Sequence, residues 1–231
     1  MNSAVKMPSS TKVDFVYVSA IVVFGVCTAL LHQRTPDFLG EDAFYADAAR
    51  NLLYHGFYGV NGNPETTQPP GLSAILAVLF AMFGYSYALC VRAMAVFEAL
   101  GFVAAYEVLR RRIPSEAAGS ICIVLMSSPL YFAWGTRLVY ACFPYFFTTM
   151  VALLCGEQFD KANEARSRIT WGAALTLAVV ASLLIATGTI ALLGAMLAVV
   201  GATALTNRRS ARQRLFKFAP VVLIGIAVQA A

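Results

Sequence analysis

The chain is 231 residues long, with 59% hydrophobic and 13% charged residues and a mean hydropathy of +0.70. Because an ordinary soluble domain has about a quarter of its residues charged, this composition excludes a soluble domain, a secreted disulfide scaffold, a nucleic-acid-binding domain and a disordered protein. The formal charge of +5 does not by itself indicate an anionic partner, since in a membrane protein lysine and arginine first set the topology. The sequence therefore predicts an integral membrane protein.

Seven apolar runs approach the length of about 20 residues that a membrane-spanning helix needs. In chain order they are Val13–Leu31, Tyr87–Leu109, Ala117–Phe132, Cys142–Gly156, Thr170–Thr187, Thr189–Leu205 and Phe216–Ala231. A further run, Gly71–Phe83, has the length of a re-entrant or interfacial segment. No cleavage site follows the first run, so it predicts a span and not a signal peptide. We expect an all-α, polytopic bundle of about 7 spans, forming one transmembrane domain over residues 1–231.

The positions of the basic residues predict how the chain is threaded. If Gly71–Phe83 does not cross the membrane, the 17 lysines and arginines fall on one side, except for Arg34, Arg50, Arg92 and Arg137. If it did cross, Arg110–Arg112 and the later basic loops would lie opposite the N-terminal lysines. The positive-inside rule favours the first threading, with the N-terminus in the cytoplasm.

This threading leaves one large loop, residues 32–86, on the outer side. The loop is acidic although the protein is basic. Its part from Glu41 to Gly56 has helical spacing and predicts a short amphipathic helix on the membrane surface, whereas the following part up to Gly71 is turn-rich and irregular. Because functional residues concentrate on loops, we expect the active residues here.

Two adjacent acids, Glu41 and Asp42, stand at the start of the predicted helix. One interpretation is helix capping, since the helix dipole favours anions at this end. The other is a general base that takes a proton from an acceptor hydroxyl, which is a role for a positioned carboxylate. Their spacing alone leaves both interpretations open.

A longer pattern surrounds this pair. The segment 40–58 (GEDAFYADAARNLLYHGFY) is followed by Gln68-Pro69-Pro70-Gly71, by an apolar run that ends Phe83-Gly84-Tyr85-Ser86, and by Arg92. Together these motifs resemble the first outer loop of the GT-C glycosyltransferases, which are polytopic enzymes that use polyprenyl-phosphate-linked sugars. The similarity covers roughly residues 37–144 and is greatest to the group of protein mannosyltransferases and lipid A aminoarabinose transferases.

The resemblance implies a GT-C fold and the transfer of a sugar from a polyprenyl-phosphate donor to a hydroxyl of a lipid, glycan or protein acceptor. It also implies inversion at the anomeric carbon and an active loop on the outer face, which we expect to be that of a bacterial inner membrane. In the family, an acid of the pair, usually an aspartate in the first position, acts as catalytic base or organises the site. Here Glu41 takes that position, so we assign the role to Asp42 and Glu41 together and leave open which one takes the proton.

The departing phosphate requires positive charge, and a guanidinium fits phosphate bidentately. Arg92, Arg50 and Arg137 are the candidates. Each has a structural alternative: Arg50 could pair with Asp47 on the same helix, Arg92 could anchor its span, and Arg137 could reach the lipid headgroups. Tyr45 could stack against a sugar or isoprenoid, or belong to the interfacial aromatic belt.

Some residues depart from the family pattern. Cys142 stands where the resemblance implies a second acid in an outer turn, and the segment from Ile185 to Thr189 lacks an Arg-Pro step that relatives often carry. The chain is also shorter than GT-C enzymes, so we expect an N-terminal portion or a truncated member. An inactive or truncated membrane subunit is therefore the alternative function. A lipid or small-molecule transporter is a further one, although transporters favour ionisable groups near the bilayer midplane.

Glu98 is the one acid that the threading puts deep inside a span, where an ionisable group indicates either a function or a buried partner. No metal site is predicted, because the five cysteines lack CxxC or Cys/His spacing and His55 has no neighbouring histidine or cysteine. No pattern indicates a soluble cofactor, although the sequence leaves a divalent metal open. The expected partners are the lipid-linked donor, the acceptor and membrane lipids, without nucleic acid.

Overall fold

The computed structural model describes residues 11–31, 41–65, 68–129, 131–132 and 139–186, without the side chains of Glu41 and Asp42. Seven helices and one short hairpin are found in this part of the chain. In order they are α1 (Thr11–Leu30), α2 (Glu41–His55), β1 (Gly59–Val60), β2 (Asn63–Pro64), α3 (Gly71–Phe83), α4 (Tyr87–Leu109), α5 (Ser115–Met126), α7 (Cys142–Lys161) and α8 (Ala165–Ile185).

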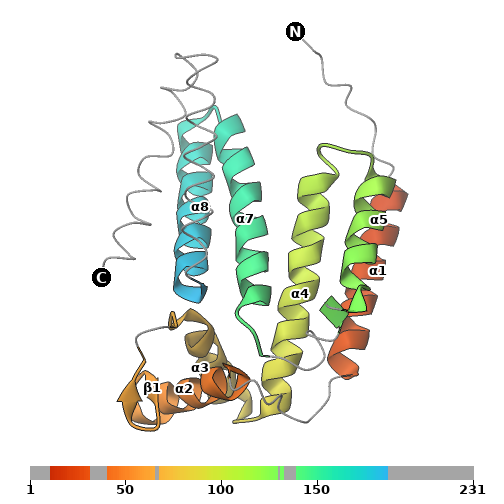
Figure 1. Ribbon diagram of the computed structural model, residues 1–231. Helices are drawn as coiled ribbons and strands as arrows, with labels where there is room; N and C mark the ends of the chain where they lie inside the picture. The colour runs from red at the N-terminus through yellow and green to blue at the C-terminus, as the bar shows by residue number, and fades with distance from the viewer. Residues whose placement is uncertain (1–10, 32–40, 66–67, 130, 133–138, 187–231) are drawn as a thin grey trace.

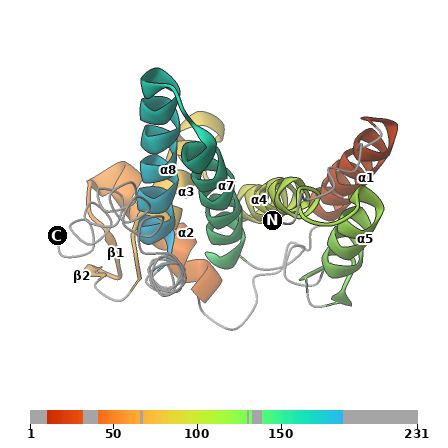
Figure 2. The same cartoon turned by 90° about the horizontal axis from the view of Figure 1, so that it is seen from above.

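The helices form two groups (Figure 1). α1, α4, α5, α7 and α8 lie with their axes along a common direction, and α2, α3 and the hairpin lie together at one end of them. Seen from above, α2 and α3 lie beneath α7 and α8 and not beneath α1 and α5 (Figure 2). The start of α1, the α4–α5 connection and the α7–α8 connection all lie at the opposite end. If α3 does not cross the membrane, these three parts of the chain must lie at one end and α2 and α3 at the other, as they do. The arrangement confirms the predicted all-α, polytopic class.

Three of the described helices, α1, α4 and α8, are long and apolar enough to cross a membrane. The bounds of α3 and α4 coincide with the predicted runs. The predicted span 117–132 was too long, because α5 ends at Met126. Ser127-Ser128-Pro129 follows, and a proline both lacks an N–H and disfavours the helical conformation in the residue before it. The predicted runs 189–205 and 216–231 lie outside the described residues, so the number of about 7 spans stays a prediction.

Small residues allow the long helices to pack closely. A Cβ added at Gly25 of α1 would lie 2.5 Å from the Cβ of Ala99 on α4. At Gly119 of α5 it would lie 2.2 Å from the ring of Tyr17. Since lipid provides no hydrophobic drive between helices, such close approach is a main source of their association in a membrane.

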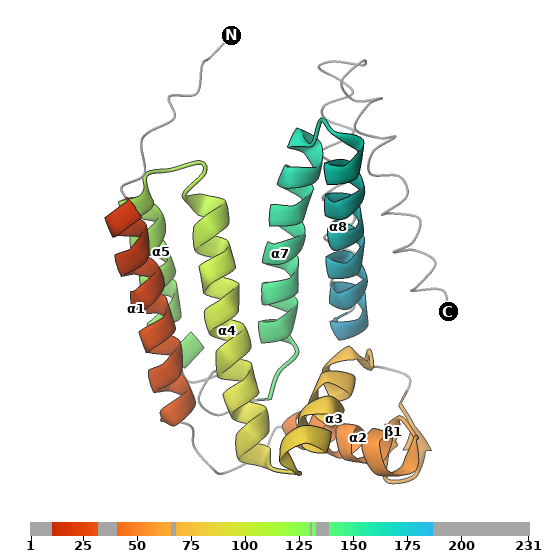
Figure 3. The ribbon, with the colours of Figure 1, turned by 180° about the vertical axis from the view of Figure 1, so that it is seen from behind.

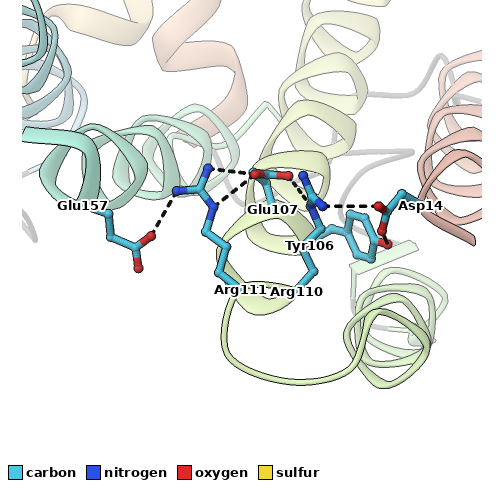
Figure 4. A network of polar contacts seen from close by, with 6 residues as sticks. All are labelled: Asp14, Tyr106, Glu107, Arg110, Arg111 and Glu157. Atoms are coloured by element: carbon cyan, nitrogen blue, oxygen red, sulfur yellow. Dashed lines mark hydrogen bonds and ion pairs between the residues drawn. The ribbon is translucent and has the colours of Figure 1, made fainter. Parts of the chain in front are cut away.

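A polar network joins α1 to α4 at the end opposite to α2 and α3 (Figure 4). The Tyr106 hydroxyl donates a hydrogen bond to Asp14 Oδ1 at 2.6 Å, and Arg110 Nη1 lies 3.2 Å from Asp14 Oδ2. Tyr106 itself is buried. The network therefore pairs the carboxylate in the first turn of α1 with a donor from the last turn of α4 and an arginine just after it.

The same network continues from α4 to α7. Glu107 pairs with Arg110 and with Arg111, and Arg111 Nη1 lies 3.1 Å from Glu157 Oε2. Arg112 Nη2 lies 2.7 Å from the other oxygen of Glu157. This pairing explains why α7 continues to Lys161, five residues beyond the predicted end of the run at Gly156. Glu157, the acid that follows the apolar run, is thus neutralised by arginines of the connection between α4 and α5.

The described residues 41–65, which the predicted threading puts in the outer loop, fold largely as predicted. α2 ends at His55, and Gly56 follows with a φ of 63°, a left-handed conformation that glycine adopts without strain. The segment after it was predicted to be irregular, but β1 and β2 form an antiparallel hairpin in which Val60 pairs with Asn63. Asn61 and Gly62 between them have φ values of 53° and 80°, as a two-residue hairpin turn requires.

Candidate functional site

The two acids that are predicted to act as the catalytic base begin helix α2. Glu41 and Asp42 are its first two residues, at the end of the bundle where α2, α3 and the hairpin gather (Figure 3). The first N–H groups of a helix have no partner within it, and the helix dipole is positive there. The start of a helix therefore favours a nearby anion, which is compatible with both the capping and the base interpretations.

Packing against α3 holds α2 in place. Tyr45, Ala46 and Ala49 of α2 are buried in one cluster with Leu72 and Leu76 of α3. The Ser73 hydroxyl of α3 also donates a hydrogen bond to the Tyr45 carbonyl at 3.4 Å. The alanines let the two helices approach, so α2 is held by its packing against α3.

Gln68 is held by three other residues of the predicted outer loop, residues 32–86. Its side-chain Oε1 accepts a hydrogen bond from the Tyr45 hydroxyl at 3.0 Å, and its backbone carbonyl accepts one from the Tyr58 hydroxyl at 2.9 Å. Its backbone N–H donates to Glu65 Oε1 at 2.8 Å. No partner of its amide nitrogen is found among the described residues.

The Tyr58 hydroxyl stays protonated under ordinary conditions. Burial, and to a smaller extent the nearby charge of Glu65, raises the pKa of Tyr58 from 10.0 to about 12. The phenol therefore remains a donor to the carbonyls of Gln68 and Pro69, the second at 3.3 Å.

Arg50 is exposed on α2, and its Cζ lies 5.7 Å from the centre of the Tyr85 ring, a cation–π distance. Among the described residues, no carboxylate lies within ion-pair distance of Arg50, so the alternative of a pair with Asp47 is not found. The pKa of Tyr85 is raised, first by partial burial and then by the charge of Asp47. The guanidinium of Arg50 is therefore placed by the Tyr85 ring, and it forms no ion pair within the described part of the chain.

The other predicted site residues, Tyr45, Arg92 and Arg137, do not lie on one element. Tyr45 is only 3% exposed and bonds to Gln68, so its ring is part of the core. Arg92 is exposed on α4, one and a half turns from the start of that helix. Arg137 lies outside the described residues. The structure thus brings Tyr45 to the helix that begins with the acidic pair, and Arg50 lies further along the same helix.

Sequence reasoning did not single out Gln68 or Tyr85 as site residues. Both stood in quoted motifs, but neither carries a charge that would draw attention to it. Their roles depend on partners 23 residues away for Gln68 and 35 for Tyr85, which no local pattern reveals. Among the side chains that the structure describes, no group of three or more His, Cys, Asp and Glu residues could hold a metal ion.

No protein-family model matches the chain, and no curated protein is significantly similar to it. Solved structures with a similar fold include two of one protein. ArnT from Cupriavidus metallidurans bound to undecaprenyl phosphate superposes with a TM-score of 0.70 at 19% identity, over 96% of this chain and 41% of that one. The apo structure of the same protein gives a TM-score of 0.70 and 19% identity over 94% and 40%. The chain thus spans about two fifths of the solved chains, and it shares their GT-C-type membrane fold.

Proposed function

We propose that the chain belongs to a membrane glycosyltransferase that moves a sugar from a polyprenyl-phosphate donor to a hydroxyl of a lipid, glycan or protein acceptor on the outer face. The observation that carries this proposal is the fold shared over 96% of the chain with ArnT bound to undecaprenyl phosphate. The acidic pair at the start of α2 supports it, because an acceptor hydroxyl needs a base where it meets the donor.

In this mechanism Asp42 or Glu41 takes the proton of the attacking hydroxyl. The hydroxyl oxygen bonds to the anomeric carbon while the bond to the lipid phosphate breaks, so a single displacement inverts that carbon. The phosphate leaves as an anion, and Arg50, Arg92 and Arg137 are the proposed groups that stabilise it. The exposure of Arg50 and Arg92 supports this role, since a guanidinium must be accessible to meet a ligand.

Tyr45 acts in this proposal through Gln68. Its hydroxyl donates a hydrogen bond to the amide oxygen of Gln68, and this bond also fixes the direction of the amide nitrogen. Tyr45 follows Glu41 by four residues and Asp42 by three, and residues so spaced share a helix face. Gln68 is therefore the proposed neutral donor next to the acidic pair, and Tyr45 is the residue that positions it.

The test uses membranes that contain the protein, incubated with radiolabelled polyprenyl-phosphate sugars. Three proteins are compared: wild type, the double variant Glu41→Gln/Asp42→Asn, and Glu116→Gln. Glu116 is a matched control because it also lies in the first turn of a helix, α5, but at the opposite end of the bundle. The proposal expects label transfer by wild type and by Glu116→Gln, and loss of transfer in the double variant.

An inactive subunit that only binds the lipid is the second candidate. Cys142, at the start of α7, favours it, because a thiol stands where the resemblance implies a second acid. The same experiment separates the two when binding of undecaprenyl phosphate is measured alongside transfer. Binding without transfer by the folded protein supports the subunit and contradicts the transferase, whereas label movement across vesicles without a new glycosidic bond supports transport.

A further inference from the structure

A single acid lies inside the bundle among the described residues. Glu98 is the twelfth residue of α4, about 16 Å along the helix from its first residue. Its exposed fraction is 0%, and it lies on the buried face of α4 that also carries Met94, Ala95 and Phe102. A carboxyl group at this depth meets neither water nor the lipid headgroups, and every neighbour on its own face is apolar.

Both carboxyl oxygens of Glu98 are buried, and neither has a hydrogen-bond partner among the described residues. No arginine, lysine or histidine of the described part forms an ion pair with it; the five ion pairs found there involve other acids, at the far end of the bundle. An ionised carboxylate without a counter-ion is strongly disfavoured in an apolar interior. The carboxyl group of Glu98 is therefore expected to carry its proton at neutral pH.

The polar neighbours of Glu98 lie toward the predicted outer loop. Cys142 on α7 and Tyr131, in the segment before α7, are the described ionisable side chains that interact electrostatically with it, and α1 and α5 contribute none. Cys142 and Tyr131 are both only partly buried. One turn further along both helices, Gly101 of α4 faces the ring of Phe146. The start of α7 lies beside the middle of α4 and not beside its start (Figure 3).

The protonation state of Glu98 affects how the first turn of α7 is held. Ala141 precedes α7 and provides no side-chain hydrogen bond to its first turn. The Cys142 sulfur instead interacts with the backbone N–H groups of Cys142 and Phe143. A neutral carboxyl group has little attraction to this positive helix end, but a carboxylate would be drawn to it and would compete with the Cys142 sulfur for these N–H groups. Gain and loss of one proton would thus change how the outer turn before α7 is held against α4.

We propose that Glu98 is an exchangeable proton-binding site inside the bundle, reached from the outer side past Cys142 and Tyr131. The site is independent of sugar transfer, because it needs neither the acidic pair of α2 nor a lipid donor. Its ligand is the proton, and the group that responds to it is the first turn of α7, where Cys142 lies.

The first test is chemical modification of the purified protein in phosphatidylcholine vesicles. Dicyclohexylcarbodiimide adds to protonated carboxyl groups in apolar surroundings and leaves an N-acylurea, which peptide mass spectrometry locates. Glu98 is expected to react with this reagent at neutral pH, to react less as the pH rises, and not to react with a water-soluble carbodiimide. Exposed Glu116 is the internal control and should react with the water-soluble reagent. Absence of reaction at Glu98 at every pH would overturn the proposal.

The second test compares infrared spectra of wild type and Glu98→Gln, a variant of nearly the same shape that removes the proton site. The wild type is expected to show a protonated-carboxyl carbonyl band that shifts when H₂O is replaced by D₂O and is lost in Glu98→Gln. No difference between the two proteins at neutral pH would mean that Glu98 is ionised, and a band that never shifts would mean that its proton does not exchange. Either result contradicts the site, and neither depends on whether the protein transfers sugar.

Discussion

Replacing Tyr106 with phenylalanine removes one hydroxyl from the network that joins α1 to α4 and leaves the ring in the core. The lost interaction is a 2.6 Å hydrogen bond to the carboxylate of Asp14, and a hydrogen bond to a charged group contributes about 1.5–3 kcal/mol. Asp14 keeps its ion pair with Arg110, so the carboxylate is not left alone. We expect Tyr106→Phe to lower the free energy of unfolding by about 2 kcal/mol, which corresponds to about 4–8 °C in Tm for a chain of this size.

Reaction of the buried cysteines with a thiol reagent measures this decrease in Tm. Cys90, Cys122 and Cys155 are free and buried, so a fluorogenic thiol reagent reacts with them as the detergent-solubilised protein unfolds on heating. Tyr17→Phe is the matched control, because Tyr17 lies 6.1 Å from Tyr106 between ring centres but its hydroxyl has no hydrogen bond among the described residues. Equal melting temperatures for Tyr106→Phe and Tyr17→Phe would refute the role given to the Tyr106 hydroxyl.

Two further predictions concern packing and pH. Gly25→Val should separate α1 from α4, because even a Cβ there would lie 2.5 Å from Ala99, and it should lower the free energy of unfolding by about 1–3 kcal/mol. Gly156→Ala is the control, because its Cβ would meet only Leu175 at 3.9 Å, and it should melt close to wild type. Equal decreases in Tm for the two variants would contradict the close packing of α1 and α4. The folded-state pKa of Tyr58 is raised from 10.0 to about 12, so its contribution to stability is fully present below pH 10 and is lost as the pH rises through 12. The phenolate absorbance difference between wild type and Tyr58→Phe checks this, and ionisation of Tyr58 together with exposed tyrosines would disprove it.

The sequence could predict those parts of the fold that hydrophobicity alone determines. The bounds of α3 and α4 follow from uninterrupted apolar runs, and the end of α2 follows from Gly56. Two errors came from local signals that were present: Pro129 ends α5 early, and the Asn61-Gly62 step forms a hairpin turn. Both signals act over a few residues and could have been used.

Other features depend on partners distant in the sequence. α7 extends through Glu157 because arginines about 45 residues earlier neutralise it, and Tyr106 meets Asp14 across 92 residues. The position of Gln68 likewise depends on Tyr45. For the candidate site, the sequence predicted the helix that carries the acidic pair, whereas the core position of Tyr45 and the bonds around Gln68 required the packed structure.

The most direct test of the proposed transfer is the initial rate of label transfer from polyprenyl-phosphate sugars in membranes, compared between wild type and Glu41→Gln/Asp42→Asn. A positioned general base contributes about 10²–10⁴-fold to a rate, so the double variant should lose at least about a hundredfold while Glu116→Gln stays near wild type. Transfer by the double variant at the wild-type rate would contradict the assignment of the acidic pair as the catalytic base.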